Sequence, residues 1–177
     1  MYSRDVDELP VIGADIVHLD KNMFMWVQLT HFGEAPEGDM SAIAALIASP
    51  GYADDYASPF HIEQQPVEPP VHGRWWLSAI EAGSFEPTTA VEAEKRIRSW
   101  VDDQDWIDPS YRQPPDVLRR LQTVFDLLRV GKVYALSNPG DDAMHDYGAV
   151  TGGLGFHEFV VIDRANGTVH VVVASDD

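Results

Sequence analysis

Apolar runs rich in β-branched residues recur along the chain and predict the strands of a sheet. Two pairs of runs are separated by short turn sequences and therefore predict hairpins. One turn is Asp20-Lys21-Asn22, and the other contains Asn166-Gly167, a pair that accepts the positive φ angles of a tight reversal. The predicted strands are residues 11–18, 23–29, 74–80, 132–136, 156–162 and 168–173, with 60–63 as a weaker candidate.

Helical periodicity predicts three helices between the two hairpins. They cover residues 39–47, beginning at Asp39 or Ser41, residues 90–101, introduced by the capping box Thr89–Glu92, and residues 117–128. On the second helix, Glu92–Arg96 and Glu94–Arg98 are spaced for i,i+4 ion pairs. After the third helix, Gly131 stands where a left-handed cap belongs. The whole pattern predicts an α+β fold, a mostly antiparallel sheet with helices packed on one face.

Length and composition fit a single domain over residues 1–177. A chain of 177 residues can bury a core that folds without a metal ion or a disulfide. It contains no cysteine, which excludes thiolate zinc sites and cysteine nucleophiles and fits a reducing cytoplasm. Its beginning lacks the basic and apolar regions of a signal peptide, and no apolar run approaches the roughly 18 residues of a bilayer span. We therefore expect a cytoplasmic protein.

The chain is strongly acidic, with 29 Asp and Glu against 12 Lys and Arg and a formal net charge of −17. Up to Phe60, ten acidic residues face two basic ones. Such a surface repels nucleic acids and acidic membranes, so we expect neither as a partner. It favours a basic protein partner, although solubility alone also accounts for an acidic surface.

The residue types that carry chemistry do not form a familiar active-site pattern. No two of the seven histidines lie at i,i+2 or i,i+4 spacing, and His61 with Glu63 on one strand face would give too few metal ligands. Ser78 and Ser84 lack the nucleophile elbow. The loop from Thr151 to Gly155 has three glycines, but it lacks the Lys-Ser/Thr ending of a phosphate loop and precedes a strand. We therefore expect no metal, no cofactor and no enzymatic activity.

The C-terminal third resembles the ending of bacterial toxin immunity proteins. The resemblance lies in the run from Gly152 to Asp163 and in the valine-rich strand from Asn166 to Val173, which together close an α+β fold as a hairpin. Size, acidity and residue usage look most like the mycobacterial immunity factors that neutralise the tuberculosis necrotizing toxin. A related superfamily of the Smi1/Knr4 type has a similar ending. The resemblance implies a cytosolic antitoxin that occupies the NAD-binding site of a secreted NAD-glycohydrolase toxin, with no catalytic residue of its own.

We therefore predict an antitoxin that is monomeric when free and forms a one-to-one complex with a protein toxin. A segment that fills a cofactor cleft needs little side-chain bulk, as in the glycine loop, or a proline-stiffened backbone, as near Pro66. A tryptophan set among acidic residues is a suitable interface anchor. The predicted partner-binding residues are Gln64, Gln65, Trp106, Thr151, Gly152 and Gly153. Two alternatives remain, a secretion chaperone or adaptor with the same acidic surface and a small enzyme with dispersed catalytic residues.

Overall fold

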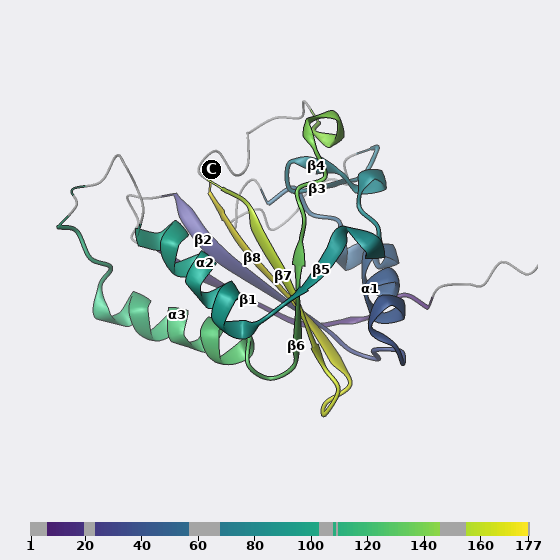
Figure 1. Ribbon diagram of the computed structural model, residues 1–177, viewed down its shortest axis with the longest axis horizontal. Helices are drawn as coiled ribbons and strands as arrows, with labels where there is room; N and C mark the ends of the chain where they lie inside the picture. The colour runs from purple at the N-terminus through teal and green to yellow at the C-terminus, as the bar shows by residue number, and fades with distance from the viewer. Residues whose placement is uncertain are drawn as a thin grey trace, which may run out of the picture.

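A six-stranded antiparallel sheet forms the centre of the computed structural model (Figure 1). The structure describes residues 7–19, 24–56, 68–102, 108, 110–145 and 155–176. The strands lie in the order β1-β2-β8-β7-β6-β5, and each pairs antiparallel with its neighbours. Their bounds are β1 Val11–His18, β2 Met25–Phe32, β5 Phe85–Thr88, β6 Lys132–Leu136, β7 His157–Asp163 and β8 Thr168–Asp176. A separate two-stranded sheet pairs β3 (Val71–His72) with β4 (Trp75–Trp76).

Three α-helices and four short 3₁₀ turns complete the described part of the chain. The helices are α1 Asp39–Ala48, α2 Ala90–Asp102 and α3 Pro115–Leu127; the turns are η1 Pro50–Tyr52, η2 Leu77–Ala79, η3 Ala82–Ser84 and η4 Asp141–Ala143. Helices α2 and α3 lie side by side on one face of the sheet, whereas α1 lies on the opposite side (Figure 1). The sheet is thus enclosed between two layers.

The α+β class and the antiparallel sheet are as predicted, but the helices do not all lie on one face. The reason is that the central strands are apolar on both faces. In β7, Phe159 and Val161 pack in the core with α2 and α3, while Val160 and Ile162 pack in the core with α1. Because alternate residues of a strand point to opposite faces, a run that is apolar throughout needs cover on both.

Most of the predicted elements are confirmed, and the exceptions have local causes. Both hairpins, all three helices and β6 form where the pattern placed them. The predicted strand 74–80 shrinks to Trp75–Trp76, after which the chain turns at η2. The strand β5 was not predicted; it contains Pro87, which a sheet tolerates at an edge, where β5 lies. The candidate strand 60–63 lies outside the described residues.

Two glycines next to the hairpins serve different purposes. Gly167 has a φ of 63°, so the turn between β7 and β8 uses its left-handed conformation as predicted. Gly131 has no positive φ, and the predicted left-handed cap is wrong. A Cβ at this position would lie 2.1 Å from the carbonyl oxygen of Ile162, so glycine is required there by the close approach of two backbones.

Asp39 ties α1 to the far end of the sheet. Its carboxylate accepts hydrogen bonds from the hydroxyl of Tyr134 (2.5 Å) and the guanidinium of Arg164 (2.9 Å), and it pairs with Lys132 (3.0 Å). These donors, the Tyr134 hydroxyl first, hold the pKa of Asp39 well below its usual range. The contacts fix α1 against β6 and the β7–β8 turn.

Candidate functional site

All six predicted partner-binding residues lie outside the described part of the structure. They are Gln64, Gln65, Trp106, Thr151, Gly152 and Gly153. The last glycine of the same loop, Gly155, is described and has a φ of 145°. A Cβ at Gly155 would lie 2.7 Å from Nε2 of His157 and 3.3 Å from the Trp100 ring, so only glycine fits between them.

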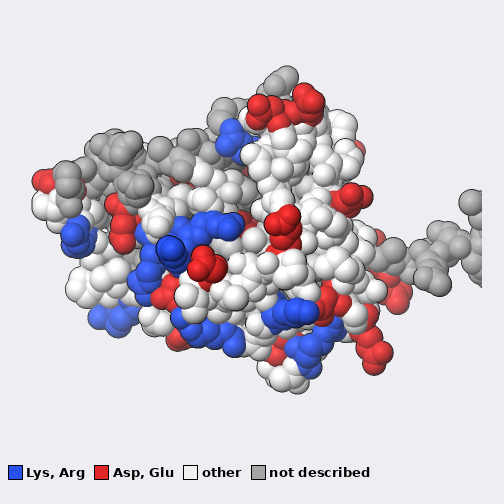
Figure 2. All heavy atoms as spheres, viewed as in Figure 1, with Lys and Arg blue, Asp and Glu red and all other residues white. Residues whose placement is uncertain are grey.

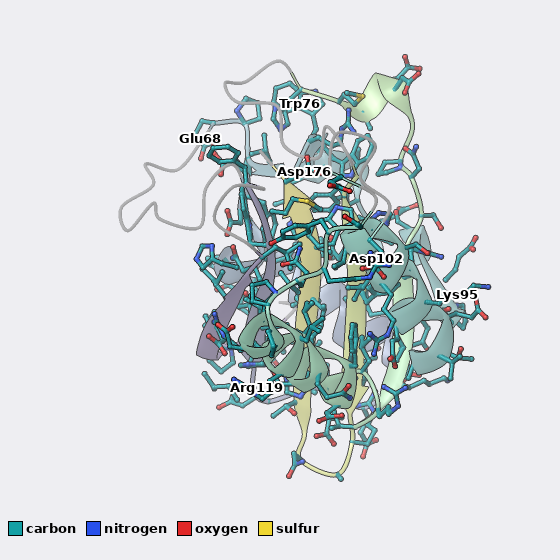
Figure 3. All side chains as sticks on the ribbon, turned by 90° about the vertical axis from the view of Figure 1, so that its left-hand side faces the viewer. Glu68, Trp76, Lys95, Asp102, Arg119 and Asp176 are labelled. Carbon is teal, nitrogen blue, oxygen red and sulfur yellow. The ribbon has the colours of Figure 1, made fainter. Side chains whose placement is uncertain are left out.

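Gly155 borders a pocket of about 410 Å³ at one end of the sheet. Strand β6 pairs with β7 only as far as Ala135 opposite Phe159, whereas β7 continues along β8 to His157. The start of β7 is therefore left without β6 beside it, and the space is enclosed by other elements. Its lining includes Arg74, Trp75, Arg96, Ser137, Phe156 and His157. Figure 3 shows Trp76, next to Trp75 in β4, and Asp176, at the end of β8, toward this same end of the sheet.

One wall of the pocket is cationic. The guanidinium carbon of Arg96 lies 5.3 Å from the centre of the Phe159 ring. The predicted Glu92–Arg96 ion pair is absent, whereas the predicted Glu94–Arg98 pair is present at 2.7 Å. Burial, and then the charge of Arg96, lower the pKa of His157. Arg96 is thus directed toward the pocket and His157 rather than along the surface of α2.

The opposite wall is aromatic. The guanidinium of Arg74 lies 5.6 Å from the centre of the Trp75 ring. Phe156 packs edge-on against Tyr56, with ring centres 5.7 Å apart, and its ring fills the space that a side chain at Gly73 would need. These packed rings give part of the pocket lining a rigid, apolar character.

Behind the aromatic wall, a buried hydrogen-bond network joins Tyr52, His72 and Glu158. Nε2 of His72 lies 2.6 Å from one Glu158 oxygen, and the Tyr52 hydroxyl donates to the other at 2.7 Å. Nδ1 of His72 donates to the main-chain carbonyl of Tyr52 at 2.6 Å. Burial, and then the Glu158 carboxylate, raise the pKa of the Tyr52 hydroxyl well above its usual value. The hydroxyl therefore remains a donor.

This network has the residue types of an acid–base site but the environment of a structural one. The side chains of His72 and Glu158 are both fully buried, and the rings of Tyr52 and His72 stack 3.8 Å apart. No substrate atom can reach a group enclosed in this way. The network joins η1, β3 and β7 and so fixes the aromatic wall of the pocket. His72 is 20 residues from Tyr52 and 86 residues from Glu158 in the sequence, so no short sequence motif contains the network.

A second, open groove runs over α2 and α3. It has a volume of about 630 Å³ and is lined by Val91, Glu94, Lys95, Arg98 and Arg129, among others. Glu94 accepts from both Arg98 and Arg129, so both arginines of this groove have a carboxylate partner. In Figure 3, Lys95 points outward from the body of the protein.

Charge is unevenly distributed over the molecule. Residues 90–132 contain eight acidic and eight basic residues, so the remaining 21 acidic and four basic residues account for the whole net charge of −17. Figure 2 shows the Lys and Arg side chains gathered mainly over α2 and α3, while Asp and Glu predominate around α1 and η4. On this face, the region around α1 and η4 is therefore more acidic than the region over α2 and α3.

Two classes of site are missing from the described part of the chain. No group of three or more His, Cys, Asp or Glu side chains could hold a metal ion there, and none of its helices is long and apolar enough to cross a membrane. Comparison with known proteins finds no matching family model, curated protein or solved structure. Function must therefore be inferred from the pocket, the network and the charge distribution themselves.

Proposed function

We propose that this chain is an antitoxin, an immunity protein that binds a secreted NAD-glycohydrolase toxin one-to-one in the cytoplasm and blocks its NAD-binding site. The observation that carries the proposal is the separation of charge between the two sides of the molecule. Negative charge concentrated on one side gives the protein an electric dipole moment. It would speed association with a basic partner and turn the acidic side toward it.

A patch at the start of β1 supplies apolar contacts within this acidic side. Val11 and Ile12 are 50% and 60% exposed, and the acidic residues Asp7 and Glu8 stand a few positions before them in the chain. The amide of Gly33 donates a hydrogen bond to the carbonyl of Pro10, and this contact brings Glu34 close to the start of β1. We call Asp7, Glu8, Val11, Ile12 and Glu34 the β1 patch. Apolar side chains with a charged rim are the composition expected of a protein interface.

The edge of β1 itself is poorly suited to strand addition. The amide of Ile16 donates to its neighbour Asp15 at 2.8 Å, and the Ile16 carbonyl accepts a hydrogen bond from Arg120. Side chains that occupy edge groups in this way hinder pairing with another strand. A partner would therefore meet the patch through side chains, in the manner of a globular inhibitor.

Co-expression with an NAD-glycohydrolase toxin of the necrotizing class tests the proposal. The chain should protect the host cell, and Ile12→Arg should weaken protection because it places a bulky positive charge in the patch. Val91→Arg is the matched control: Val91 is 65% exposed but lies on the nearly neutral side, so this variant should protect fully. Failure of the unmodified chain to protect contradicts the proposal, whereas a stable complex with an active toxin would indicate a chaperone.

A further inference from the structure

We infer that the pocket at the start of β7 binds a small organic anion whose phosphate or carboxylate group is attached to a flat ring. This inference is independent of the proposed antitoxin activity, because the pocket is separate from the β1 patch. It depends on Arg96, on its neighbours in the pocket and on the aromatic residues of the lining.

Arg96 lines the pocket and has no carboxylate partner among the described residues. In a chain with more than twice as many acidic as basic residues, the nearby arginines have carboxylate partners: Arg98 and Arg129 both pair with Glu94. Arg96 has no ion pair within the described residues, although Glu92 stands one helical turn before it. Its guanidinium lies instead over the Phe159 ring, which leaves the planar N–H groups available to a ligand in the pocket.

The neighbours of Arg96 reinforce its preference for an anion. His157 and Arg74 line the same pocket, and Ser137 and Asn138 add side chains that can donate hydrogen bonds. A guanidinium binds phosphate or carboxylate through two parallel N–H groups, and hydrogen bonds to ionised groups are the strong ones. Arg96 and Arg74 therefore place positive charge and hydrogen-bond donors around the same space, which favours an anionic ligand.

One acidic residue, Glu158, also borders the pocket, but its carboxylate is turned away from Arg96. Phe159 lies under Arg96 in the core with α2, and alternation along β7 directs Glu158 to the opposite face. There both carboxylate oxygens are engaged, one by His72 and one by the Tyr52 hydroxyl. The Glu158 carboxylate is therefore held by its hydrogen bonds on the other face of β7, away from an anion beside Arg96.

The size and the opposite wall of the pocket define the rest of the ligand. A volume of about 410 Å³ suits a small organic molecule better than a bare ion. Trp75 and Phe156 contribute aromatic residues to the same lining. A ligand with a ring and an anionic group fits both walls at once, and phenyl phosphate and benzoate are simple probes of the two anionic classes.

Calorimetric and NMR titrations of the intact protein test the inference. Phenyl phosphate or benzoate should bind saturably and more tightly than phenol, and the probe that binds identifies the anionic class. Arg96→Gln should weaken binding at least tenfold. Arg98→Gln, which removes the same charge two residues away, should leave binding unchanged because Arg98 lines the other groove.

The His157 side chain supplies a second measurement that does not depend on a variant. A bound anion should raise the pKa of His157, because negative charge stabilises the imidazolium form. The inference is overturned if neither probe binds saturably up to about 10 mM. It is also overturned if Arg96→Gln and Arg98→Gln weaken binding equally, which would indicate a diffuse charge effect.

Discussion

Replacement of Glu158 by leucine should destabilise the protein strongly, although it exchanges a charged residue for an apolar one inside a core. The carboxylate is the common partner of the Tyr52 hydroxyl and Nε2 of His72, and both partners are fully enclosed. Leucine would leave these two polar groups buried without an acceptor, which costs about 1–3 kcal/mol for each. Removing one member of a buried ion pair costs about 3–5 kcal/mol in all.

We therefore expect Glu158→Leu to lower the free energy of unfolding by about 3–5 kcal/mol. For a domain of this size, such a loss lowers Tm by roughly 2–4 °C per kcal/mol. Glu158→Gln should cost less, about 1–2 kcal/mol. Its amide oxygen can still accept from Tyr52, and its NH₂ group can donate to a neutral His72.

Urea unfolding followed by tryptophan fluorescence measures both changes. Glu86→Leu serves as the control because Glu86 is an exposed glutamate on the edge strand β5; it should alter stability by no more than about 0.5 kcal/mol. A loss below about 1 kcal/mol for Glu158→Leu would refute the reasoning, because the network would then contribute no more than an ordinary surface contact.

Two further predictions concern backbone approach and pH. Gly131→Ala should lower Tm by several degrees, because its Cβ would lie 2.1 Å from the Ile162 carbonyl oxygen, a backbone atom that no side-chain movement can displace. Thermal unfolding measures this change, and an unchanged Tm would contradict the close approach of the two backbones. Burial lowers the pKa of both His31 and His170, whose Nδ1 atoms are 2.8 Å apart. As pH falls through the ordinary histidine pKa of 6.5, the unfolded chain therefore takes up protons before the folded protein does, and the free energy of unfolding should decrease. The decrease should be less steep in His170→Gln. Urea unfolding midpoints at several pH values measure both slopes.

Local patterns predicted the elements of the fold but not their layering. Periodicity placed both hairpins and the helices because side-chain spacing follows directly from helix and strand geometry. The same pattern could not decide which face each helix covers. That choice depends on β7 and β8 being apolar on both faces. It also depends on the contacts that join Asp39 in α1 to β6. Short elements such as β5, with four residues and a proline, carry too little periodicity to be recognised.

The pocket was beyond prediction for a related reason. Its residues come from β4, α2, β7 and the chain after β6, so no short motif contains them. One prediction in this region was wrong. The i,i+4 spacing of Glu92 and Arg96 predicted an ion pair, but Arg96 packs instead over Phe159 and beside His157. The glycine loop did indicate close packing, and Gly155 at its end borders the pocket.

Titration of the toxin's NAD hydrolysis with the purified chain tests the proposed antitoxin function most directly. The toxin is held at a fixed concentration, well above the expected Kd, and the chain is added in steps. The account predicts that the rate falls linearly and reaches zero at one equivalent, that Val91→Arg follows the same line, and that Ile12→Arg requires an excess. Undiminished hydrolysis in the presence of excess chain would contradict it.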